Sequence, residues 1–445
     1  MISSNFRLLF FLIYYLFNFA VYGFENALLV LPIFIPILLG VCNIKVRAFC
    51  LLDMFYLVSF LFFVISPMQT IIGNRMDPTS PLSLYYVSFD TKVEVVTIFT
   101  LFFTAFYMLQ RKYKIFDNSF SHLFDSFIFT DKQVVRNFLV LFIVLISSTI
   151  IYVFLKGGLV NVLAPRFEKD SSLSNPIGLA FLAISMTCFF HIVATYRMNL
   201  ASGKLLLPLL ALSFCLMLVL CNPTNSPRFM IVACWVPVFF ILVVGRVSAV
   251  SFYLVVLLSI VFILPILSLT TRTGLEGLSF IDQRNFLAGF LKLPYIDVFD
   301  TGIYAIDYLK RNGHSLGENL VLMMGFFIPR SIWLSKPDLF SLSIGEELYA
   351  SGSAGTPNLS MTYIIELYGD FYYLGVLLAS ILTFLFFYLL IRNTARLRFI
   401  VILQLCFLGA LPILIRGPAP AVSGLFFCQF FSMFLIQFLL VKKKF

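Results

Sequence analysis

Long apolar runs recur along the whole chain and limit the folds that are available to it. A helix needs roughly 20 mostly apolar residues to cross the hydrocarbon layer of a membrane. Only helices and closed barrels satisfy their backbone hydrogen bonds there, and barrel strands would alternate polar and apolar residues over about ten positions. The runs in this sequence do not alternate. The sequence therefore predicts an all-α integral membrane protein.

Twelve runs have the length and composition of membrane-spanning helices. Hydrophobic residues occupy 61% of the 445 positions and charged residues 12%, whereas soluble domains are about half apolar and about a quarter charged. This composition excludes a soluble globular domain. The twelve spans are expected at residues 6–24, 27–44, 48–66, 93–110, 137–155, 177–196, 205–221, 229–245, 247–269, 374–391, 398–415 and 422–441.

Basic residues between the spans indicate the orientation of the chain. With the N-terminus in the cytoplasm, the inside segments, with Arg7 counted among them, carry 17 of the 31 Lys and Arg residues and the short outside loops carry seven. This is the asymmetry of the positive-inside rule, which exempts long loops. Both termini are therefore expected in the cytoplasm. The net charge of +10 follows from topology and does not indicate nucleic-acid binding.

The spans divide the chain into three parts. A nine-span bundle is expected at 1–269, a long extracytoplasmic loop at 270–373, and a three-span bundle at 374–445. A loop of about a hundred residues without structure of its own would be unusual, so this segment is expected to be folded or functional.

Two short helices are expected within the long loop. Apolar residues recur at helical spacing near its middle, which predicts an amphipathic helix on the outer membrane face. Residues 320–328 are apolar but too short to span, which favours a re-entrant or interfacial segment that Pro329 ends or kinks. The apolar stripe consists of Val298, Phe299, Ile303, Ile306 and Leu309, and the polar side of Asp297, Asp300, Asp307, Lys310 and Arg311.

Two basic residues stand close together in the stretch FFIPRSIWLSKPDLF. Arg330 and Lys336 flank Trp333 there. One interpretation is a snorkelling pair that anchors an interfacial segment beside the tryptophan. The other is an anion site, because an arginine offers two donors to one phosphate and a lysine adds a point charge.

Further arginines are expected on the same outer side. Arg166 lies in LAPRFEKDSSLSNPIG, where surface pairing with a nearby acid is the simpler interpretation and would contribute little. Arg228 lies on a very short outside turn, and an ionisable group at such depth favours a function. Arg272, Arg284 and Arg416 are weaker members of the same set.

Several residues of the outer segments are candidates for a general base. A carboxylate or an imidazole within hydrogen-bond reach of an attacking hydroxyl group could accept its proton. Each carboxylate, taken singly, is more simply a solvated loop acid, and a lone loop histidine usually has no such role. The candidates are Glu346, Glu347, Glu366, Asp370 and His314.

Several other classes of chemistry lack their motifs. The sequence contains no GxxxxGK[ST] phosphate-binding loop and no HExxH or CxxC cluster for a metal. The eight cysteines fall in or at the ends of predicted spans without paired spacing, so packing is expected for them. Asp53 and Glu94 are the main acids of the spans, which is sparse for a proton-coupled transporter. No metal or cofactor is therefore expected.

The order of these features resembles the Wzy-type O-antigen polymerases of bacteria, which join oligosaccharide repeat units. The likeness in layout covers the whole chain: twelve spans, a moderate outside loop near the middle, and one long outside loop before the last three spans. The likeness in local sequence covers 313–357, with GHSLGENLVLMMGFFIPRSIWLSKPDLF followed by GEELYASGSAG.

The resemblance implies a lipid-dependent, GT-C-like glycosyltransferase bundle in the bacterial cytoplasmic (inner) membrane. The donor would be the growing glycan on polyprenyl pyrophosphate, the acceptor one repeat unit on the same lipid, and polyprenyl pyrophosphate the leaving group. A chain-length regulator protein is a further candidate partner. Arginines of the two larger outside loops would stabilise the departing pyrophosphate, a role that carries onto Arg166 and Arg330 with Lys336 as helper. Some members place a glycine eleven residues after the first arginine, whereas Gly178 is twelve after Arg166.

Two alternatives stay open. O-antigen ligases, which transfer finished glycan to a lipid A core, have a similar layout. They carry a histidine, then Asn, Ser or Gln, nine residues, a glycine and a small residue three positions later. His314, Ser315 and Gly325 fit that spacing, but position 328 is Ile. A lipid-linked oligosaccharide flippase would show two similar halves and short loops, and this chain shows neither.

Overall fold

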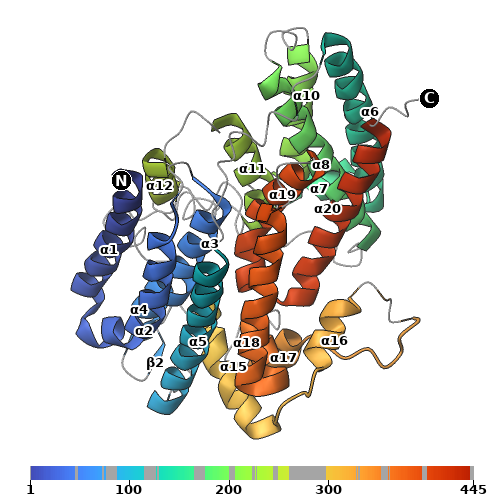
Figure 1. Ribbon diagram of the computed structural model, residues 1–445. Helices are drawn as coiled ribbons and strands as arrows, with labels where there is room; N and C mark the ends of the chain where they lie inside the picture. The colour runs from blue at the N-terminus through green and yellow to red at the C-terminus, as the bar shows by residue number, and fades with distance from the viewer. Residues whose placement is uncertain are drawn as a thin grey trace. The chain divides into compact units, whose positions relative to one another are not determined.

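The computed structural model is helical. It describes residues 2–45, 49–72, 75–76, 88–114, 127, 130–164, 176–199, 206–222, 226, 228–243, 249–259, 297–326, 328, 331–351, 359, 361–392 and 398–440 (Figure 1). Strands in this part of the chain are limited to an antiparallel pair of two residues each, β1 (Ile71–Ile72) and β2 (Arg75–Met76). The prediction of an α-helical protein is therefore confirmed.

Seven of the described helices are long and apolar enough to cross a membrane, which confirms an α-helical membrane protein. The segments are Phe24–Cys42, Leu51–Thr70, Phe89–Tyr113, Asp131–Leu155, Ile177–Met198, Tyr363–Arg392 and Ser423–Leu440. Shorter apolar helices cover Phe6–Tyr22, Leu207–Leu220, Met230–Val243 and Ile400–Arg416. Each of the twelve predicted runs contains described helix. The number that cross the membrane stays a prediction.

The chain folds into two compact units. Unit 1 contains Met1–Asp117, Lys292–Ile391 and Leu411–Gly424, and unit 2 contains Asn118–Leu291, Arg392–Ala410 and Leu425–Phe445. These units group residues by contact, so the predicted division into a nine-span bundle, a loop and a three-span bundle stays a prediction about topology.

Unit 2 is built around α8, which packs against α6, α10 and α11. Small side chains let the helices approach closely: Ser148 of α6 and Ser185 of α8 hydrogen-bond to each other at 2.7 Å. The helices of this unit are α6 (Asp131–Leu155), α7 (Leu159–Leu163), α8 (Pro176–Met198), α10 (Leu207–Leu220), α11 (Arg228–Val243) and α12 (Ala249–Leu258). Helices α19 (Arg398–Arg416) and α20 (Ala419–Leu440) each contribute residues to both units.

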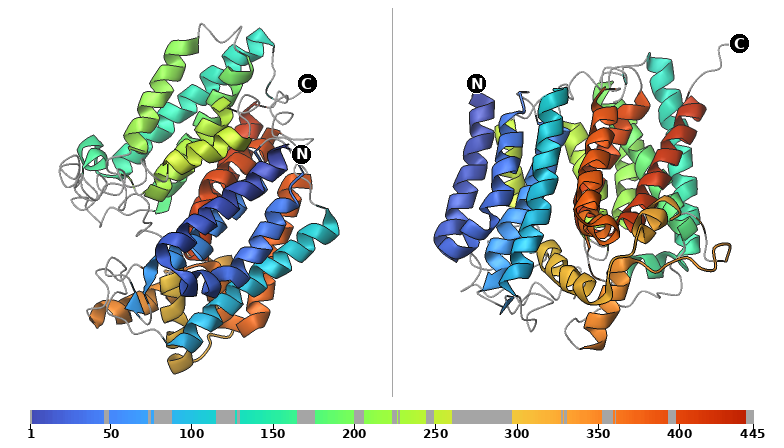
Figure 2. Two further views of the ribbon diagram at one scale, coloured as in Figure 1. Left: turned by 90° about the vertical axis from the view of Figure 1, so that its left-hand side faces the viewer. Right: turned by 60° about the horizontal axis from the view of Figure 1, so that its bottom comes forward.

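Unit 1 combines the first helices of the chain with the helices of the predicted loop. Figures 1 and 2 show α15, α16 and α17 gathered at one end of this unit, next to ends of α5 and α18. Its helices are α1 (Ile2–Tyr22), α2 (Phe24–Cys42), α3 (Leu51–Phe60), the π-helix η1 (Leu61–Ile65), α4 (Ser66–Thr70), α5 (Phe89–Tyr113), α15 (Val298–Asn312), α16 (Glu318–Met324), α17 (Phe340–Ala350) and α18 (Tyr363–Arg392).

A buried ion pair joins α1 to α3 inside unit 1. The Arg7 guanidinium donates from Nε to Asp53 Oδ1 at 2.6 Å and from Nη2 to Oδ2 at 2.8 Å, and both side chains are fully buried. Asp53 Oδ2 also accepts the backbone N–H of Cys50 at the start of α3. Arg7 was counted among the cytoplasmic basic residues, but here its charge is neutralised inside the helical core.

Helix α15 differs from the predicted surface helix. Its apolar stripe is present, and Val298, Phe299 and Ile303 are completely buried against α4, η1 and α5. Two acids of the polar side are buried as well: Asp300 accepts a hydrogen bond from Thr70 Oγ1 at 2.9 Å, and Asp297 pairs with Arg416 at 2.9 Å. Since these partners lie on other elements of unit 1, the first turns of α15 belong to the core of this unit, and the position of the helix at the outer membrane face stays a prediction.

Helix α16 ends earlier than predicted. It covers Glu318–Met324 and ends at Gly325, four residues before Pro329, the predicted terminator. A Cβ atom at Gly325 would come within 2.8 Å of the ring of Trp333, so a larger residue there would require the indole to shift.

Helix α18 begins at Tyr363, well before the predicted span at 374–391. The helix bends just ahead of that span. The backbone leaves helical geometry at Phe371 and Tyr372, and Tyr372 has a φ of 55°. Gly375 makes this bend possible, because a Cβ atom there would overlap the carbonyl oxygen of Leu367. The segment before the bend is buried, including Glu366 and Asp370 at 3% and 1% exposure. The interpretation of these two carboxylates as solvated loop acids was wrong.

Candidate functional site

The structure describes some of the predicted site residues and not others. Arg228 begins α11, but its side chain lies outside the described atoms. The side chains of His314, Lys336, Glu346 and Glu347 are described, and all belong to unit 1. The predicted site residues that lie outside the described part of the chain are Arg166, Arg272, Arg284 and Arg330.

His314 is held in one orientation between α15 and α16. Its Nδ1 lies 3.0 Å from the carbonyl oxygen of Gly369 and 3.2 Å from that of Tyr368. Because a carbonyl oxygen can only accept, Nδ1 carries the proton and Nε2 is left as the acceptor of the neutral ring. The ring also stacks on Tyr372, with centroids 3.4 Å apart. The bend in α18 therefore fixes the imidazole from two directions.

Asp370 fixes the segment that follows His314. Its carboxylate accepts Ser315 Oγ at 2.7 Å, the Asn319 backbone N–H at 3.1 Å and side-chain amide at 2.9 Å, and the Leu320 N–H at 2.8 Å. A carboxylate that accepts N–H groups of a first helical turn stabilises that helix end. Asp370 therefore positions α16 and is fully engaged in doing so, which leaves it poorly suited to act as a base.

Glu347 forms an ion pair on α17. Its Oε1 accepts Arg311 Nη1 at 2.7 Å and the Tyr304 hydroxyl at 2.8 Å. Burial raises the pKa of Tyr304, so this phenol stays protonated at neutral pH and can donate. Glu347 is therefore already engaged by a cation and a hydroxyl donor. Glu346 on the same helix is exposed and has no hydrogen bond to a described residue.

A second charged network links α5, α15 and α18 beside His314. Glu94 accepts the Tyr368 hydroxyl at 2.6 Å and pairs with Lys310 at 2.8 Å. The ring of Tyr368 lies 5.6 Å from that of His314. The sequence indicated Glu94 only as an acid of a predicted span, because Glu94 lies more than 200 positions from both Lys310 and Tyr368.

Lys336 closes the turn after α16. Its Nζ donates to the carbonyl oxygens of Gly325, Phe326 and Ile328 at 3.3, 2.9 and 2.8 Å. The ammonium group also lies 5.8 Å from the centroid of Trp333. Since an ammonium has three donors, these carbonyls occupy all of them. Lys336 therefore stabilises the turn that follows α16 and precedes Arg330 in the sequence.

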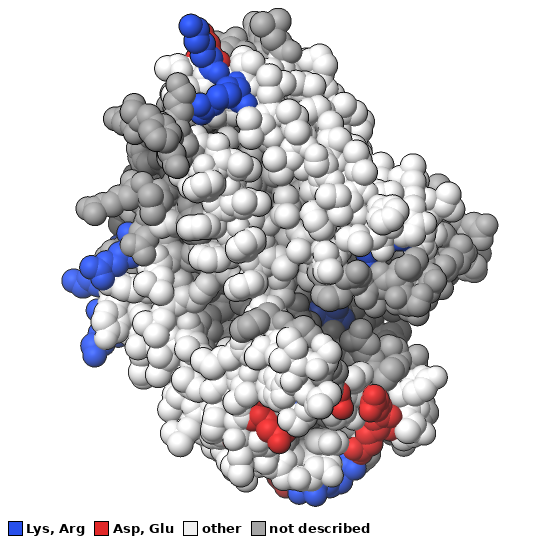
Figure 3. All heavy atoms as spheres, turned by 90° about the vertical axis from the view of Figure 1, so that its right-hand side faces the viewer, with Lys and Arg blue, Asp and Glu red and all other residues white. Residues whose placement is uncertain are grey.

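One face of the molecule carries few described charged side chains. On the face drawn in Figure 3, Lys, Arg, Asp and Glu are sparse among the described residues and uncharged side chains predominate. No cluster of three or more His, Cys, Asp or Glu that could hold a metal occurs in the described segments.

Comparisons with known proteins place no further constraint on this site. The chain matched no family model, no curated protein and no solved structure. The resemblance to the Wzy-type polymerases therefore stays a prediction from the sequence.

Proposed function

We propose that this protein is a lipid-dependent glycosyltransferase that polymerises oligosaccharide repeat units carried on polyprenyl pyrophosphate. The product would be O-antigen or a related surface polysaccharide, made at the outer face of the bacterial inner membrane. The observation that supports this most is the orientation of His314, with Nδ1–H tied to backbone carbonyls and Nε2 left as an acceptor.

The reaction needs a base and a site for the leaving group. A hydroxyl group of the acceptor sugar attacks the anomeric carbon of the donor, and its proton passes to His314 Nε2. A new glycosidic C–O bond forms while the bond to pyrophosphate breaks, and polyprenyl pyrophosphate leaves with the electron pair. Arg330, with Arg166, would stabilise the negative charge that develops there. Arg228, Arg272 and Arg284 are weaker candidates for the same role.

Among the candidate bases, the surroundings favour His314. Glu347 is paired with Arg311, Asp370 accepts four hydrogen bonds, and Glu366 is 3% exposed. Glu346 is exposed, but nothing in the described structure orients it. A base must be both accessible and held in a defined orientation, and His314 is half-buried with its Nδ1 fixed by the backbone carbonyls of Tyr368 and Gly369.

An O-antigen ligase is the second candidate. The spacing of His314, Ser315 and Gly325 favours it, and Gly325 lies close against the ring of Trp333. Ile328 departs from the small residue of the ligase pattern. The Pro-Arg and Lys-Pro elements that follow are similar to the polymerases, which keeps polymerisation as the first proposal.

A gel of surface and lipid-linked glycans separates these functions. The samples come from cells that lack the gene, with and without a plasmid copy. Core lipid capped by a single repeat, with a ladder restored by the plasmid, supports a polymerase. Uncapped core beside long lipid-linked polymer would instead indicate a ligase. Lipid-linked repeats that accumulate on the inner leaflet would indicate a flippase.

A further inference from the structure

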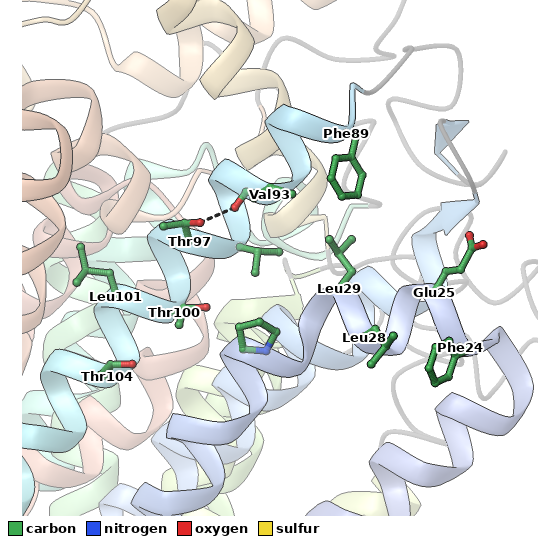
Figure 4. Close-up of a pocket in the computed structure, with 12 residues that line it drawn as sticks. Phe24, Glu25, Leu28, Leu29, Phe89, Val93, Thr97, Thr100, Leu101 and Thr104 are labelled. Atoms are coloured by element: carbon green, nitrogen blue, oxygen red, sulfur yellow. Dashed lines mark hydrogen bonds between the residues drawn. The ribbon is translucent and has the colours of Figure 1, made fainter.

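An open groove runs between α2 and α5 on unit 1. It encloses about 1110 Å³ and is lined by two faces that point toward each other (Figure 4). We call it the α2–α5 groove. Its lining residues are Phe24, Glu25, Leu28, Leu29 and Pro32 of α2 and Phe89, Val93, Val96, Thr97, Thr100, Leu101 and Thr104 of α5.

The lining of the groove suits a hydrocarbon. Both helices are candidate membrane spans, and Leu28 and Val93 are 46% and 39% exposed. The hydroxyl group of Thr97 donates to the Val93 carbonyl oxygen at 2.8 Å, so this polar group of the lining is already paired within α5. Glu25 is the one charged lining residue and belongs to the first turn of α2. An uncharged chain is therefore favoured along the remaining length.

The groove is longer than one leaflet of a bilayer. The α5 side of its lining extends from Phe89 to Thr104, which at 1.5 Å per residue is about 22 Å. Half of a 30 Å hydrocarbon core is about 15 Å. Its volume also exceeds the roughly 300–1,000 Å³ of ordinary small-molecule pockets. These dimensions fit one extended hydrocarbon chain.

One end of the groove adjoins the candidate site. Val93 lines the groove, and its neighbour Glu94 accepts the Tyr368 hydroxyl at 2.6 Å. The backbone carbonyl of Tyr368 in turn lies 3.2 Å from His314 Nδ1. A lipid whose tail occupied the groove would therefore have its head group near the end of unit 1 that holds His314.

We propose that the α2–α5 groove binds the hydrocarbon tail of a polyprenyl lipid. The choice of a polyprenyl chain rests on the proposed function, whereas the choice of a long hydrocarbon rests on the lining and length of the groove. The groove fixes the lipid by its tail and leaves the head group free for the arginines of the outer segments.

Native mass spectrometry of the full-length protein tests this. The probe is undecaprenyl phosphate, titrated in competition with phosphatidylglycerol. Thr97→Trp fills the groove, and Met108→Trp adds the same bulk to an α5 position that is 63% exposed and outside the lining. We expect Thr97→Trp to weaken undecaprenyl phosphate binding at least tenfold and Met108→Trp to leave it unchanged. Leu28→Trp serves as a second groove variant should Thr97→Trp fold poorly.

Two results would overturn the proposal. One is equal undecaprenyl phosphate binding by wild type and both groove variants. The other is binding of phosphatidylglycerol to the groove as tightly as undecaprenyl phosphate, which would make the groove a site for ordinary membrane lipid. Binding of the probe requires no catalysis. If the groove variants bind undecaprenyl phosphate more weakly but the wild-type protein has no polymerase activity, only the proposed function is rejected. A glycan ladder with groove-independent binding would reject only the groove.

Discussion

A charged side chain inside this protein depends on its partner. Arg7 and Asp53 are both fully buried and form two hydrogen bonds with each other. The loss of one partner leaves the other charge buried and unpaired, which costs far more than the net contribution of the pair. The pair therefore sets the packing of α1 on α3.

Replacing Arg7 tests this dependence. We expect Arg7→Ala to lower the free energy of unfolding by about 3–5 kcal/mol, seen as a large loss of monodisperse protein on heating in detergent. Arg111→Ala, at an exposed end of α5, is the control and should behave as wild type. A double variant, Arg7→Leu with Asp53→Leu, should recover part of the loss. Equal thermal stability of Arg7→Ala and wild type would contradict the buried pair.

His314 is the residue on which the proposed chemistry depends. A general base typically contributes about 10²–10⁴ in rate, so His314→Ala should slow polymerisation at least a hundredfold without loss of folded protein. Glu318→Gln, an exposed carboxylate in the first turn of α16, is the control. The measurement is the rate at which the glycan ladder forms. A normal rate in His314→Ala together with loss in Glu346→Gln would transfer the role to Glu346.

At the scale of elements, α16 is held at both ends by side chains from elsewhere. Asp370 of α18 accepts N–H groups at its start, and Lys336 donates to carbonyl groups after its end. A helix of seven residues is too short to be stable alone. These two residues therefore hold α16 and the turn at Gly325 and Phe326 in place.

Lys336→Met should loosen the turn after α16 while it keeps contact with Trp333. Hydrogen bonds to a charged group contribute about 1.5–3 kcal/mol, so local opening should become roughly tenfold more frequent. Hydrogen exchange at the Gly325 and Ile328 amides, which donate to Val321 and Gly325, measures this. We expect polymerisation to fall partially, whereas Arg330→Ala should abolish it. Unchanged hydrogen exchange at both amides would contradict the proposal that Lys336 stabilises this turn.

The elements of the sequence were predictable to different degrees. The apolar stripe from Val298 to Leu309 predicted α15 because a 3.6-residue period reports one buried face. The burial of Asp300 was not predictable, since its partner Thr70 lies on α4, 230 positions away. The bend at Tyr372 was missed because an apolar run gives no local sign of a break that depends on Gly375 packing against Leu367.

The same limit applies to the candidate site. His314 and Glu347 were named from their residue types and from their place in an outer segment. The sequence did not reveal their hydrogen-bond partners. Gly369 and Tyr368 approach His314, and Arg311 approaches Glu347, only when the chain is folded. Asp370 was named too, but its role as the anchor of α16 depends on burial, which a single residue type does not reveal.

For the molecule as a whole, the proposed reaction requires that the segment with His314 lies on the outer side of the membrane. An even number of spans places both termini on the same side of the membrane, and the predicted orientation would put them in the cytoplasm and the segment with His314 outside. Alkaline phosphatase fused after Asn312 should be active, and the same enzyme fused after Lys444 should be inactive, because it folds only outside the cytoplasm. Expression measured by immunoblot is the control. An active fusion after Lys444 would mean an odd number of spans.

Reconstitution shows whether this chain joins lipid-linked repeat units. Lipid-linked single repeats are extracted from cells that lack the gene and incubated with the purified protein in lipid nanodiscs. We expect the wild-type protein to make longer lipid-linked glycans and to release one polyprenyl pyrophosphate for each bond formed. We expect no detectable amount of either product from His314→Ala or Arg330→Ala. Single repeats that stay unchanged beside folded wild-type protein would contradict the proposed function.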